Sequence, residues 1–187
     1  MSKTFKLLVT ELEKLPSVGK KSALKIAYHL ACKNKMQTQS FINILEKSTS
    51  QIMLCNNCGC IAENELCDFC LDPIRDRSKV CLIEDAKDVF YIEESGIYKG
   101  LYYVLESADE DALNKLLAFI NTTQIKEVIF AFSPSSSSDI LAFYIEDKLK
   151  LALSPPVFSK IAQGIPSGIK LSDIDSYSIS SAFSRRD

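Results

Sequence analysis

Four cysteines in two closely spaced pairs constrain this chain more than any other feature of its sequence. Cys55 and Cys58 are separated by two residues, and Cys67 and Cys70 repeat that spacing after eight intervening residues. Two such pairs can present four thiolates at the corners of a tetrahedron, and zinc accepts both this geometry and these soft ligands. The pattern therefore predicts one zinc ion held by Cys55, Cys58, Cys67 and Cys70.

A site with four thiolate ligands leaves no position at the metal for water or substrate, so we expect the zinc ion to be structural. Its binding keeps the short intervening loop folded, with a contribution on the order of 10 kcal/mol. Cys60 is a fifth cysteine inside this loop. Because a Cys-x-Cys pair chelates one zinc ion poorly, we expect Cys60 to be a free neighbour, and the spacing leaves open an exchange between Cys58 and Cys60. Two disulfides are the alternative, but nothing else in the sequence indicates secretion.

The composition is that of an ordinary globular protein, with 47% hydrophobic and 25% charged residues in 187, which excludes the disordered and membrane classes. No apolar run approaches the roughly 18 residues that span a bilayer, and the N-terminus lacks the apolar core of a signal peptide. We therefore expect a cytoplasmic protein with reduced cysteines and no membrane contact. Cys32 and Cys81 lie in apolar surroundings, which predicts core positions for both.

Charge is distributed unevenly along the chain, although the formal net charge is only −2. Residues 1–50 contain nine lysines and three glutamates, a net of +6, whereas the remaining 137 residues carry 13 basic and 21 acidic residues, a net of −8. This asymmetry indicates a basic module for a polyanion joined to an acidic module for a different partner. The alternative is two solvated surfaces of opposite sign.

The basic N-terminal part is predicted to be helical. Apolar residues at helical spacing indicate one helix over residues 4–14 and a second over residues 20–32. Residues 15–19 contain the proline and glycine that interrupt them. A third helix is expected over residues 39–54, leading directly into the first cysteine pair.

The start of the second predicted helix has the properties of a phosphate-binding site. Gly19 precedes the helix, where unpaired backbone N–H groups and the positive end of the helix dipole attract anions. Lys20, Lys21 and Lys25 follow, and Lys21 and Lys25 lie opposite the apolar stripe of the helix. We therefore expect Gly19, Lys20, Lys21 and Lys25 to contact phosphates. An ordinary helical hairpin with solvated lysines is the alternative.

Residues 15–23 resemble the helix-hairpin-helix motif, which binds DNA irrespective of its sequence and has a core of the type Leu-Pro-Gly-Ile-Gly-x-Lys-x-Ala. Gly19 stands at the second glycine of that core, whereas Ser17 replaces the first. Since serine tolerates a positive φ less well than glycine, this replacement bears on the closest approach of the backbone to a phosphate.

The acidic part of the chain alternates predicted strands and helices, which is typical of a mostly parallel α/β sheet. The whole chain is therefore expected to be a mixed α/β protein with a helical N-terminal part. The predicted strands cover residues 79–84, 101–105, 127–132 and 157–161. The predicted helices between them cover residues 86–94, 109–121 and 139–149.

Function in open parallel sheets gathers at the carboxyl ends of the strands, where Glu84 and Asp139 are expected. This arrangement resembles a Toprim domain, whose active members hold Mg²⁺ with a strand-end Glu and a later Asp-x-Asp. Glu84 matches the first carboxylate, but residues 135–139 read Ser-Ser-Ser-Ser-Asp and contain no such pair. A Mg²⁺-dependent Toprim nuclease or primase-like enzyme is therefore the alternative hypothesis. A purely structural role for Glu84, as a carboxylate that caps the strand end, is also open.

The order of hairpin, four cysteines, Toprim-like sheet and Gly-Ile-Pro-Ser-Gly tail resembles the RecR family of bacterial recombination-repair proteins over nearly the full chain. The match extends to the Val-Cys-Leu-Ile-Glu-Asp-Ala strand and the Ala-Gln-Gly-Ile-Pro segment. The resemblance implies four regions. These are a helix-hairpin-helix domain over 1–54, a zinc finger over 55–70, a Toprim domain over 78–160 and a wrapping or oligomerisation segment over 161–187.

The resemblance also implies a function and its partners. Such a protein is a non-enzymatic DNA-binding adaptor that forms dimers, closes into a tetrameric ring on DNA, and with RecO or RecF helps to load RecA at single-stranded gaps. Gly19, Lys20, Lys21 and Lys25 would contact DNA, and the zinc ion would fix the angle between hairpin and sheet. The implied location is the bacterial cytoplasm, at the nucleoid. A zinc-stabilised protein-interaction module without DNA contact remains the other alternative.

Two loops depart from the pattern of the family. The loop after the second predicted strand is reduced to residues 106–109, and residues 133–140 replace a segment that is usually richer in glutamate. Both loops belong to the surface that the family offers to its partner RecO. The resemblance therefore places Glu84 and Asp139 on a partner-binding face that is weakened or rebuilt in this chain.

Overall fold

The computed structural model describes residues 2–133, 135–162, 173 and 178, and it forms two compact units, Met1–Ile52 and Met53–Asp187. Each unit is described by itself. Among the described residues no helix is both long and apolar enough to cross a bilayer. The Gly-Ile-Pro-Ser-Gly tail and most of the predicted C-terminal segment lie outside the described residues.

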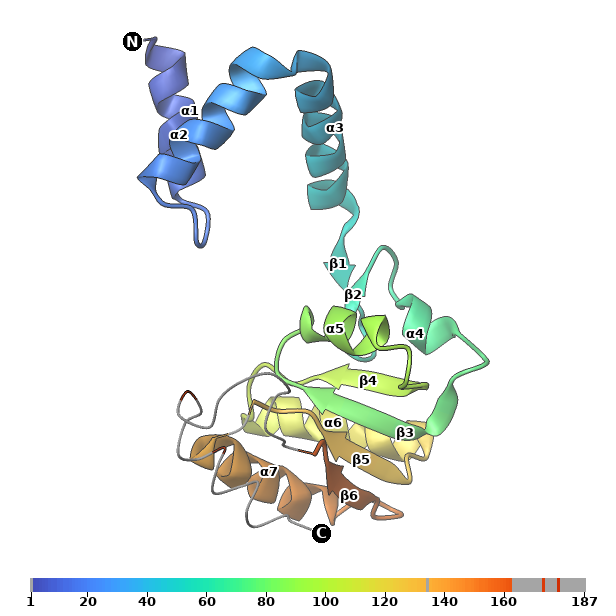
Figure 1. The fold of residues 1–187 in the computed structure, drawn as a ribbon. Coiled ribbons are helices and arrows are strands. Elements are labelled where there is room, and N and C mark those ends of the chain that lie inside the picture. Colours follow the sequence, from blue (N-terminus) through green and yellow to red (C-terminus); the bar gives the residue numbers. More distant parts are fainter. Residues whose placement is uncertain (1, 134, 163–172, 174–177, 179–187) are drawn as a thin grey trace. The chain divides into compact units, whose positions relative to one another are not determined.

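The first unit is helical (Figure 1). It contains α1 (Lys3–Glu13), α2 (Lys20–Tyr28), a short π-helical segment η1 (His29–Lys33) and α3 (Lys35–Gln51). Helices α1 and α2 pack against each other as a hairpin. The predicted hairpin is thus confirmed, with the break between its helices where proline and glycine indicated it.

The core of the hairpin is very small. Ala23 and Ala27, one helical turn apart on α2, are the fully buried hydrophobic residues among those described in this unit. Their small side chains let the two helices approach closely, but they bury little apolar surface. Neither α1 nor α3 contains a buried residue. The unit therefore presents most of its apolar side chains at its surface.

The predicted helix over residues 20–32 is correct at its start and wrong in its last turn, which widens into η1. The predicted helix over 39–54 begins earlier and ends earlier than expected. Asn34 starts it, because its side chain accepts a hydrogen bond from the Gln37 N–H at 3.0 Å. Ile52 takes an extended conformation with ψ 130°, so the chain leaves the helix before Leu54.

The second unit contains two sheets (Figure 1). In the knuckle, β1 (Met53–Leu54) pairs antiparallel with β2 (Ile61–Ala62), and α4 (Asp68–Leu71) follows. The larger sheet has the order β4-β3-β5-β6, and every neighbouring pair is parallel, as predicted. Its elements in chain order are β3 (Asp76–Ile83), α5 (Asp88–Glu94), β4 (Gly100–Val104), α6 (Glu110–Thr123), β5 (Glu127–Phe130), α7 (Ser136–Leu149) and β6 (Val157–Lys160).

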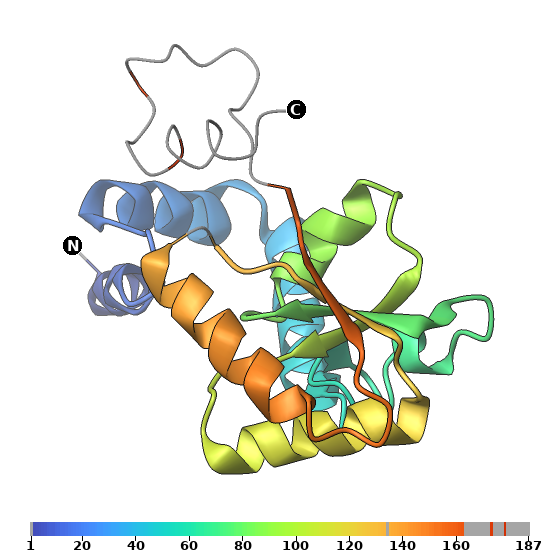
Figure 2. The ribbon, with the colours of Figure 1, turned by 90° about the horizontal axis from the view of Figure 1, so that it is seen from below.

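Helices cover both faces of this sheet, with α6 and α7 side by side on one face and α5 over the other (Figures 1 and 2). This arrangement follows from right-handed crossovers between parallel strands. Strand β4 and the second half of β3 are buried throughout, so they read as continuous apolar runs, whereas buried and half-buried residues alternate along β5. The largest fully buried side chains of the unit include Tyr102, Phe130, Leu82, Ile83, Leu113, Leu116, Ile120, Ile145 and Leu149.

Two expectations about the sheet and the core need correction. Strand β3 begins at Asp76 and not at residue 79, because Asp76 already pairs with Gly100 despite its polar side chain. Cys81 is buried in β3 as expected, but Cys32 is exposed on η1. The helical surroundings of Cys32 are apolar in sequence, yet this unit has no core large enough to bury them.

Candidate metal centre and nucleic-acid interface

Four buried sulfur atoms meet in the knuckle. Cys55 follows β1 and Cys58 lies in the next turn, while Cys67 precedes α4 and Cys70 lies within it. Their Sγ atoms all lie within 4.8 Å of one another. The Sγ atoms of Cys55 and Cys70 are 3.9 Å apart, and those of Cys58 and Cys67 are 3.5 Å apart. Zinc bonded to four sulfurs at about 2.3 Å separates them by about 3.8 Å, so this donor set fits the ion.

The backbone holds the sulfurs in place. The N–H of Cys67 donates to the Sγ of Cys55 at 3.3 Å, and Asn57 Nδ2 donates to the Sγ of Cys70 at 3.4 Å. Such N–H donors stabilise thiolates and orient them toward a metal. Sequence reasoning missed Asn57, although a polar side chain between two cysteines of a pair was a usable signal. The sulfurs are therefore oriented from both loops of the knuckle.

Cys60 lies beside these four cysteines but does not belong to the set whose sulfurs are mutually close. Its side chain is completely buried. The pKa of Cys58 is raised, and the largest cause is its hydrogen bond with Cys60, followed by its hydrogen bond with Cys67. The pKa of Cys67 is lowered, and the largest cause is its hydrogen bond with Cys58, followed by that with Cys60. The thiols of Cys58, Cys60 and Cys67 therefore influence one another.

Arg75 joins the knuckle to the larger sheet, a role that the sequence did not reveal. Its Nη2 lies 2.6 Å from Glu93 Oε2 on α5, and its Nη1 donates to the Gly100 carbonyl at 2.7 Å. Its guanidinium also lies 4.6 Å from the ring centre of Phe69 in α4. The Tyr102 hydroxyl donates to Glu93 Oε1 at 2.6 Å. One largely buried cation thus ties α4 to α5 and β4.

The turn that leads into α2 leaves backbone donors free. Gly19 is the N-cap of this helix with φ −80° and ψ 167°, and no side chain caps it. The first backbone bond of the helix runs from the Ala23 N–H to the Gly19 carbonyl at 2.9 Å. The N–H groups of residues 20–22 have no hydrogen-bond partner among the described residues. These donors point toward the end of the helix where anions bind.

Ser17 has φ 63°, in the left-handed region that serine rarely adopts. This is the position at which the helix-hairpin-helix pattern has its first glycine, so the backbone keeps the turn of the motif despite the replacement. Gly19 adopts an ordinary extended conformation, and a Cβ there would meet no atom within 4 Å. The surface above Gly19 is therefore open to a ligand.

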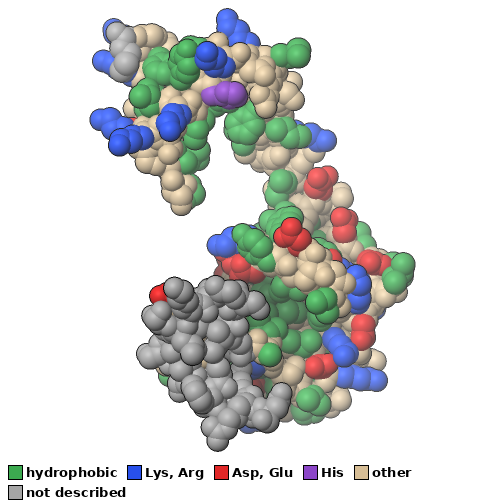
Figure 3. Space-filling model, viewed as in Figure 1, with side chains coloured by type: hydrophobic (Ala, Val, Ile, Leu, Met, Phe, Trp, Pro, Cys, Tyr) green, Lys and Arg blue, Asp and Glu red, His purple; other side chains and the backbone are tan. Residues whose placement is uncertain are grey.

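Lys20, Lys21 and Lys25 are exposed, and the structure records no ion pair for any of them among the described residues. Figure 3 shows blue side chains and hardly any red ones over the helical unit. Uncompensated lysines next to free backbone donors produce a locally positive surface. The predicted residues Gly19, Lys20, Lys21 and Lys25 thus lie on consecutive turns at the start of α2.

Glu84 and Asp139 both lie at the carboxyl edge of the larger sheet, but each has a different partner. Glu84 follows β3, and its Oε2 accepts a hydrogen bond from the Ser133 N–H at 3.3 Å. Asp139 lies in the first turn of α7, and its Oδ1 is 2.8 Å from Lys160 Nζ. Among the described residues neither belongs to a group of three or more metal-ligating side chains.

Comparison with known proteins matches both units. The RecR helix-hairpin-helix family matches residues 5–48, and the Toprim domain family matches residues 78–157. Recombination protein RecR from a Nitratiruptor species is 45% identical over 184 residues, which cover 98% of this chain and 96% of that protein. The proteins of the same name from Campylobacter jejuni (strain RM1221) and Helicobacter pylori (strain HPAG1) are each 43% identical. They cover 97% and 96% of this chain, and 95% and 92% of their own lengths.

Proposed function

Because this chain belongs to the RecR family of recombination proteins, we propose that it is a non-enzymatic DNA-binding adaptor of recombinational repair. In this proposal the protein binds DNA irrespective of sequence, forms a dimer that can close into a tetrameric ring, and helps RecO or RecF to load RecA at single-stranded gaps. It works in the bacterial cytoplasm. Its own residues perform binding and positioning and carry out no covalent chemistry.

One observation carries the DNA-binding part of the proposal. Free backbone N–H groups at the start of α2 lie next to Lys20, Lys21 and Lys25, which have no ion-pair partner among the described residues. Backbone donors and lysines recognise phosphate oxygens, which every DNA sequence presents alike. Phosphate contacts carry no sequence information, so these elements support binding without sequence preference.

Zinc is the metal that we propose for the knuckle. Cys55, Cys58, Cys67 and Cys70 supply four sulfur donors at separations that suit a tetrahedral ion, and all four are buried. When bound, the ion cross-links the two loops of the knuckle and does not act as a Lewis acid. Its role is then to keep α4 in the position where Phe69 meets Arg75.

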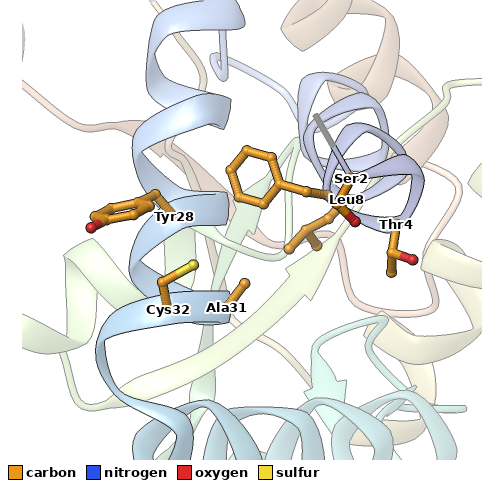
Figure 4. A pocket seen from close by; sticks show the side chains of 7 residues that line it. Ser2, Thr4, Leu8, Tyr28, Ala31 and Cys32 are labelled. Carbon is orange, nitrogen blue, oxygen red and sulfur yellow. The ribbon is translucent and has the colours of Figure 1, made fainter.

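Self-association is supported by the exposed apolar surface of the helical unit. A cavity of about 630 Å³ opens between α1 and the segment formed by α2 and η1 (Figure 4). Ala23 and Ala27 are the buried apolar residues among those described in this unit, so its other apolar side chains are available to a partner. We therefore propose that a second copy of this chain covers the cavity. It is lined by Ser2, Thr4, Phe5, Leu8, Tyr28, Ala31 and Cys32.

The carboxyl edge of the larger sheet is the proposed contact for RecO or RecF. Glu84 and Asp139 place two carboxylates there, on either side of the loop that follows β5. An acidic edge suits a basic partner and is consistent with the net negative charge of this part of the chain. The pairing of Asp139 with Lys160 reduces its share in such a contact.

The experiment that tests the proposal measures binding of the native protein and of a Lys21→Glu/Lys25→Glu variant to labelled gapped DNA. A Lys99→Glu/Lys126→Glu variant is the matched control, since it makes the same change of net charge at exposed lysines of the acidic unit. We expect the hairpin variant to lose binding and the control to retain it. Equal loss in both variants would show that net charge alone governs binding.

A further inference from the structure

Tyr28 and Lys33 form a surface feature that the proposed phosphate site does not use. The Lys33 Nζ lies over the Tyr28 ring, 5.4 Å from its centre. Tyr28 is 50% exposed, and Lys33 is exposed as well. Aromatic rings beside cations are the surfaces on which proteins stack unpaired nucleic-acid bases. The pair therefore has the chemistry of a base-binding surface.

The π-helical segment η1 brings these two side chains together. In an α-helix, residues five positions apart point about 140° apart around the axis, so Lys33 would face away from Tyr28. In η1 the Asn34 N–H instead reaches back five residues to the His29 carbonyl, at 3.4 Å. This wider turn reduces the angle between the two side chains. Short π-helical turns are rare and are frequent at functional sites, which gives the widening of this helix a reason.

Tyr28 continues the row of lysines on the exposed face of α2. Lys21, Lys25 and Tyr28 are spaced by four and three residues, which places them on one side of the helix. Lys21 and Tyr28 are about 10 Å apart along the axis, which is the rise of about three nucleotides of one DNA strand. A strand that follows the helix and meets the start of α2 with its phosphates can therefore reach the Tyr28 ring with a base.

The Tyr28 ring lies at the rim of the cavity of the helical unit. Tyr28 is among the residues that line this cavity. Figure 4 shows its ring pointing away from Leu8 and Ala31, which face the space between the helices. Covering the cavity with a second copy of the chain therefore does not require burial of the ring.

We propose that Tyr28 and Lys33 form a stacking subsite for an unpaired base of single-stranded DNA. The base stacks on the ring face opposite to Lys33, and the Lys33 ammonium attracts a neighbouring phosphate. In a duplex each base is already stacked between its neighbours, so the subsite favours single-stranded DNA over duplex DNA. Every base has a flat π face, so stacking adds no sequence preference. The inference rests on the proposed DNA binding and adds the preferred structure of the DNA.

The test compares the native protein with Tyr28→Leu, using fluorescence anisotropy of a labelled single strand and of a duplex of the same length. We expect Tyr28→Leu to bind the single strand at least about fivefold more weakly, the loss of one stacked base, and the duplex as before. Tyr28→Phe keeps the ring and should keep the native affinity. Tyr91→Leu is the matched control, because Tyr91 is 71% exposed on α5 of the other unit. Native single-strand affinity in Tyr28→Leu, or an equal loss for both DNAs, would overturn the proposal.

A second measurement detects the stacked base directly and does not depend on a loss of affinity. The chain contains no tryptophan, so Tyr28→Trp introduces a single indole fluorophore at the subsite. We expect single-stranded DNA to quench its fluorescence and duplex DNA to leave it nearly unchanged. Binding of the single strand without quenching would contradict the inference alone. Failure of the native protein to bind either DNA would contradict the proposed function, and the inference with it.

Discussion

The sulfur atoms of Cys55 and Cys70 lie 3.9 Å apart, although fifteen positions separate the two residues in the chain. This pair joins the first loop of the knuckle to α4. We expect Cys70→Ser to remove the metal and unfold the knuckle, because three thiolates and one hydroxyl hold zinc far less tightly. Metal content by atomic spectroscopy and molar mass by light scattering measure this. Cys32→Ser, at an exposed cysteine, is the control and should keep the native metal content. A Cys70→Ser protein with native metal content and native mass would refute the assignment.

The positive φ of Ser17 makes a prediction about the hairpin. The left-handed conformation costs a non-glycine residue about 1 kcal/mol, and glycine removes this cost. We therefore expect Ser17→Gly to stabilise the hairpin by up to about 1 kcal/mol, as measured by hydrogen exchange of the α1 and α2 amides. Gly19→Ala is the comparison. Gly19 has an ordinary φ that alanine also adopts, so glycine gives the hairpin no stability through φ at this position. Destabilisation by Ser17→Gly would show that the serine side chain supports the turn.

The ion pair of Arg75 with Glu93 predicts a pH dependence of stability. Burial raises the pKa of Glu93, but hydrogen bonds from Arg75 and Tyr102 outweigh it, so this pKa lies below its ordinary value of 4.5. A carboxylate with a lowered pKa stabilises the fold above the unfolded-state value, and this contribution is lost as the pH falls through the folded-state value. We expect Glu93→Gln to cost about 2 kcal/mol of unfolding free energy at neutral pH. The deficit should shrink below about pH 4.5.

Urea unfolding of both proteins at matched pH and zinc concentration measures this difference. Comparing the two proteins at the same pH cancels the pH dependence of metal binding itself. A deficit of Glu93→Gln that stays constant down to about pH 3 would mean that the Glu93 carboxylate gains nothing from Arg75. Lys87, which pairs with Asp85 at an exposed site, offers a control, since solvent screens this ion pair and Lys87→Gln should leave the stability nearly unchanged.

The open cavity of the helical unit predicts the assembly state. Ala31 is exposed and lines this cavity, so Ala31→Glu introduces a charge where a second copy would bury apolar surface. We expect light scattering to show a dimer or larger assembly for the native protein and mostly monomer for Ala31→Glu. Met36→Glu is the matched control, because Met36 is 86% exposed on α3 and lies outside the cavity lining. Native assembly in Ala31→Glu would exclude this surface as the interface.

Much of this structure could be predicted because strong local signals agreed with the fold. The two cysteine pairs specify their own geometry, and the structure brings together all four predicted sulfurs. Short apolar runs indicated the strands of the larger sheet, since buried parallel strands are apolar on both faces, and apolar residues at helical spacing indicated the helices between them. Proline and glycine before α2 marked the break of the hairpin. These features depend on neighbours in the sequence.

The remaining features depend on contacts between distant residues. Arg75 reads as an ordinary charge after the knuckle, and only the fold brings it to Glu93, Gly100 and Phe69. Cys32 was predicted to be buried because its neighbours are apolar, but the helical unit lacks a core to receive it. The widening of the helix at His29–Lys33 left no mark in the apolar spacing. Sequence patterns indicate which residues are apolar. They do not indicate whether other residues of the same chain bury those side chains.

Salt dependence of DNA binding tests the central claim most directly, namely that the start of α2 binds phosphates. The logarithm of affinity should fall by about 0.9 per logarithmic unit of salt for each duplex phosphate that is neutralised. We predict that the native protein binds gapped DNA with a clear slope that is the same for unrelated sequences. The Lys21→Glu/Lys25→Glu variant should lose affinity, and its slope should fall by about 1.8, the share of two phosphates. An unchanged slope in this variant, or a strong preference of the native protein for one sequence, would contradict the account.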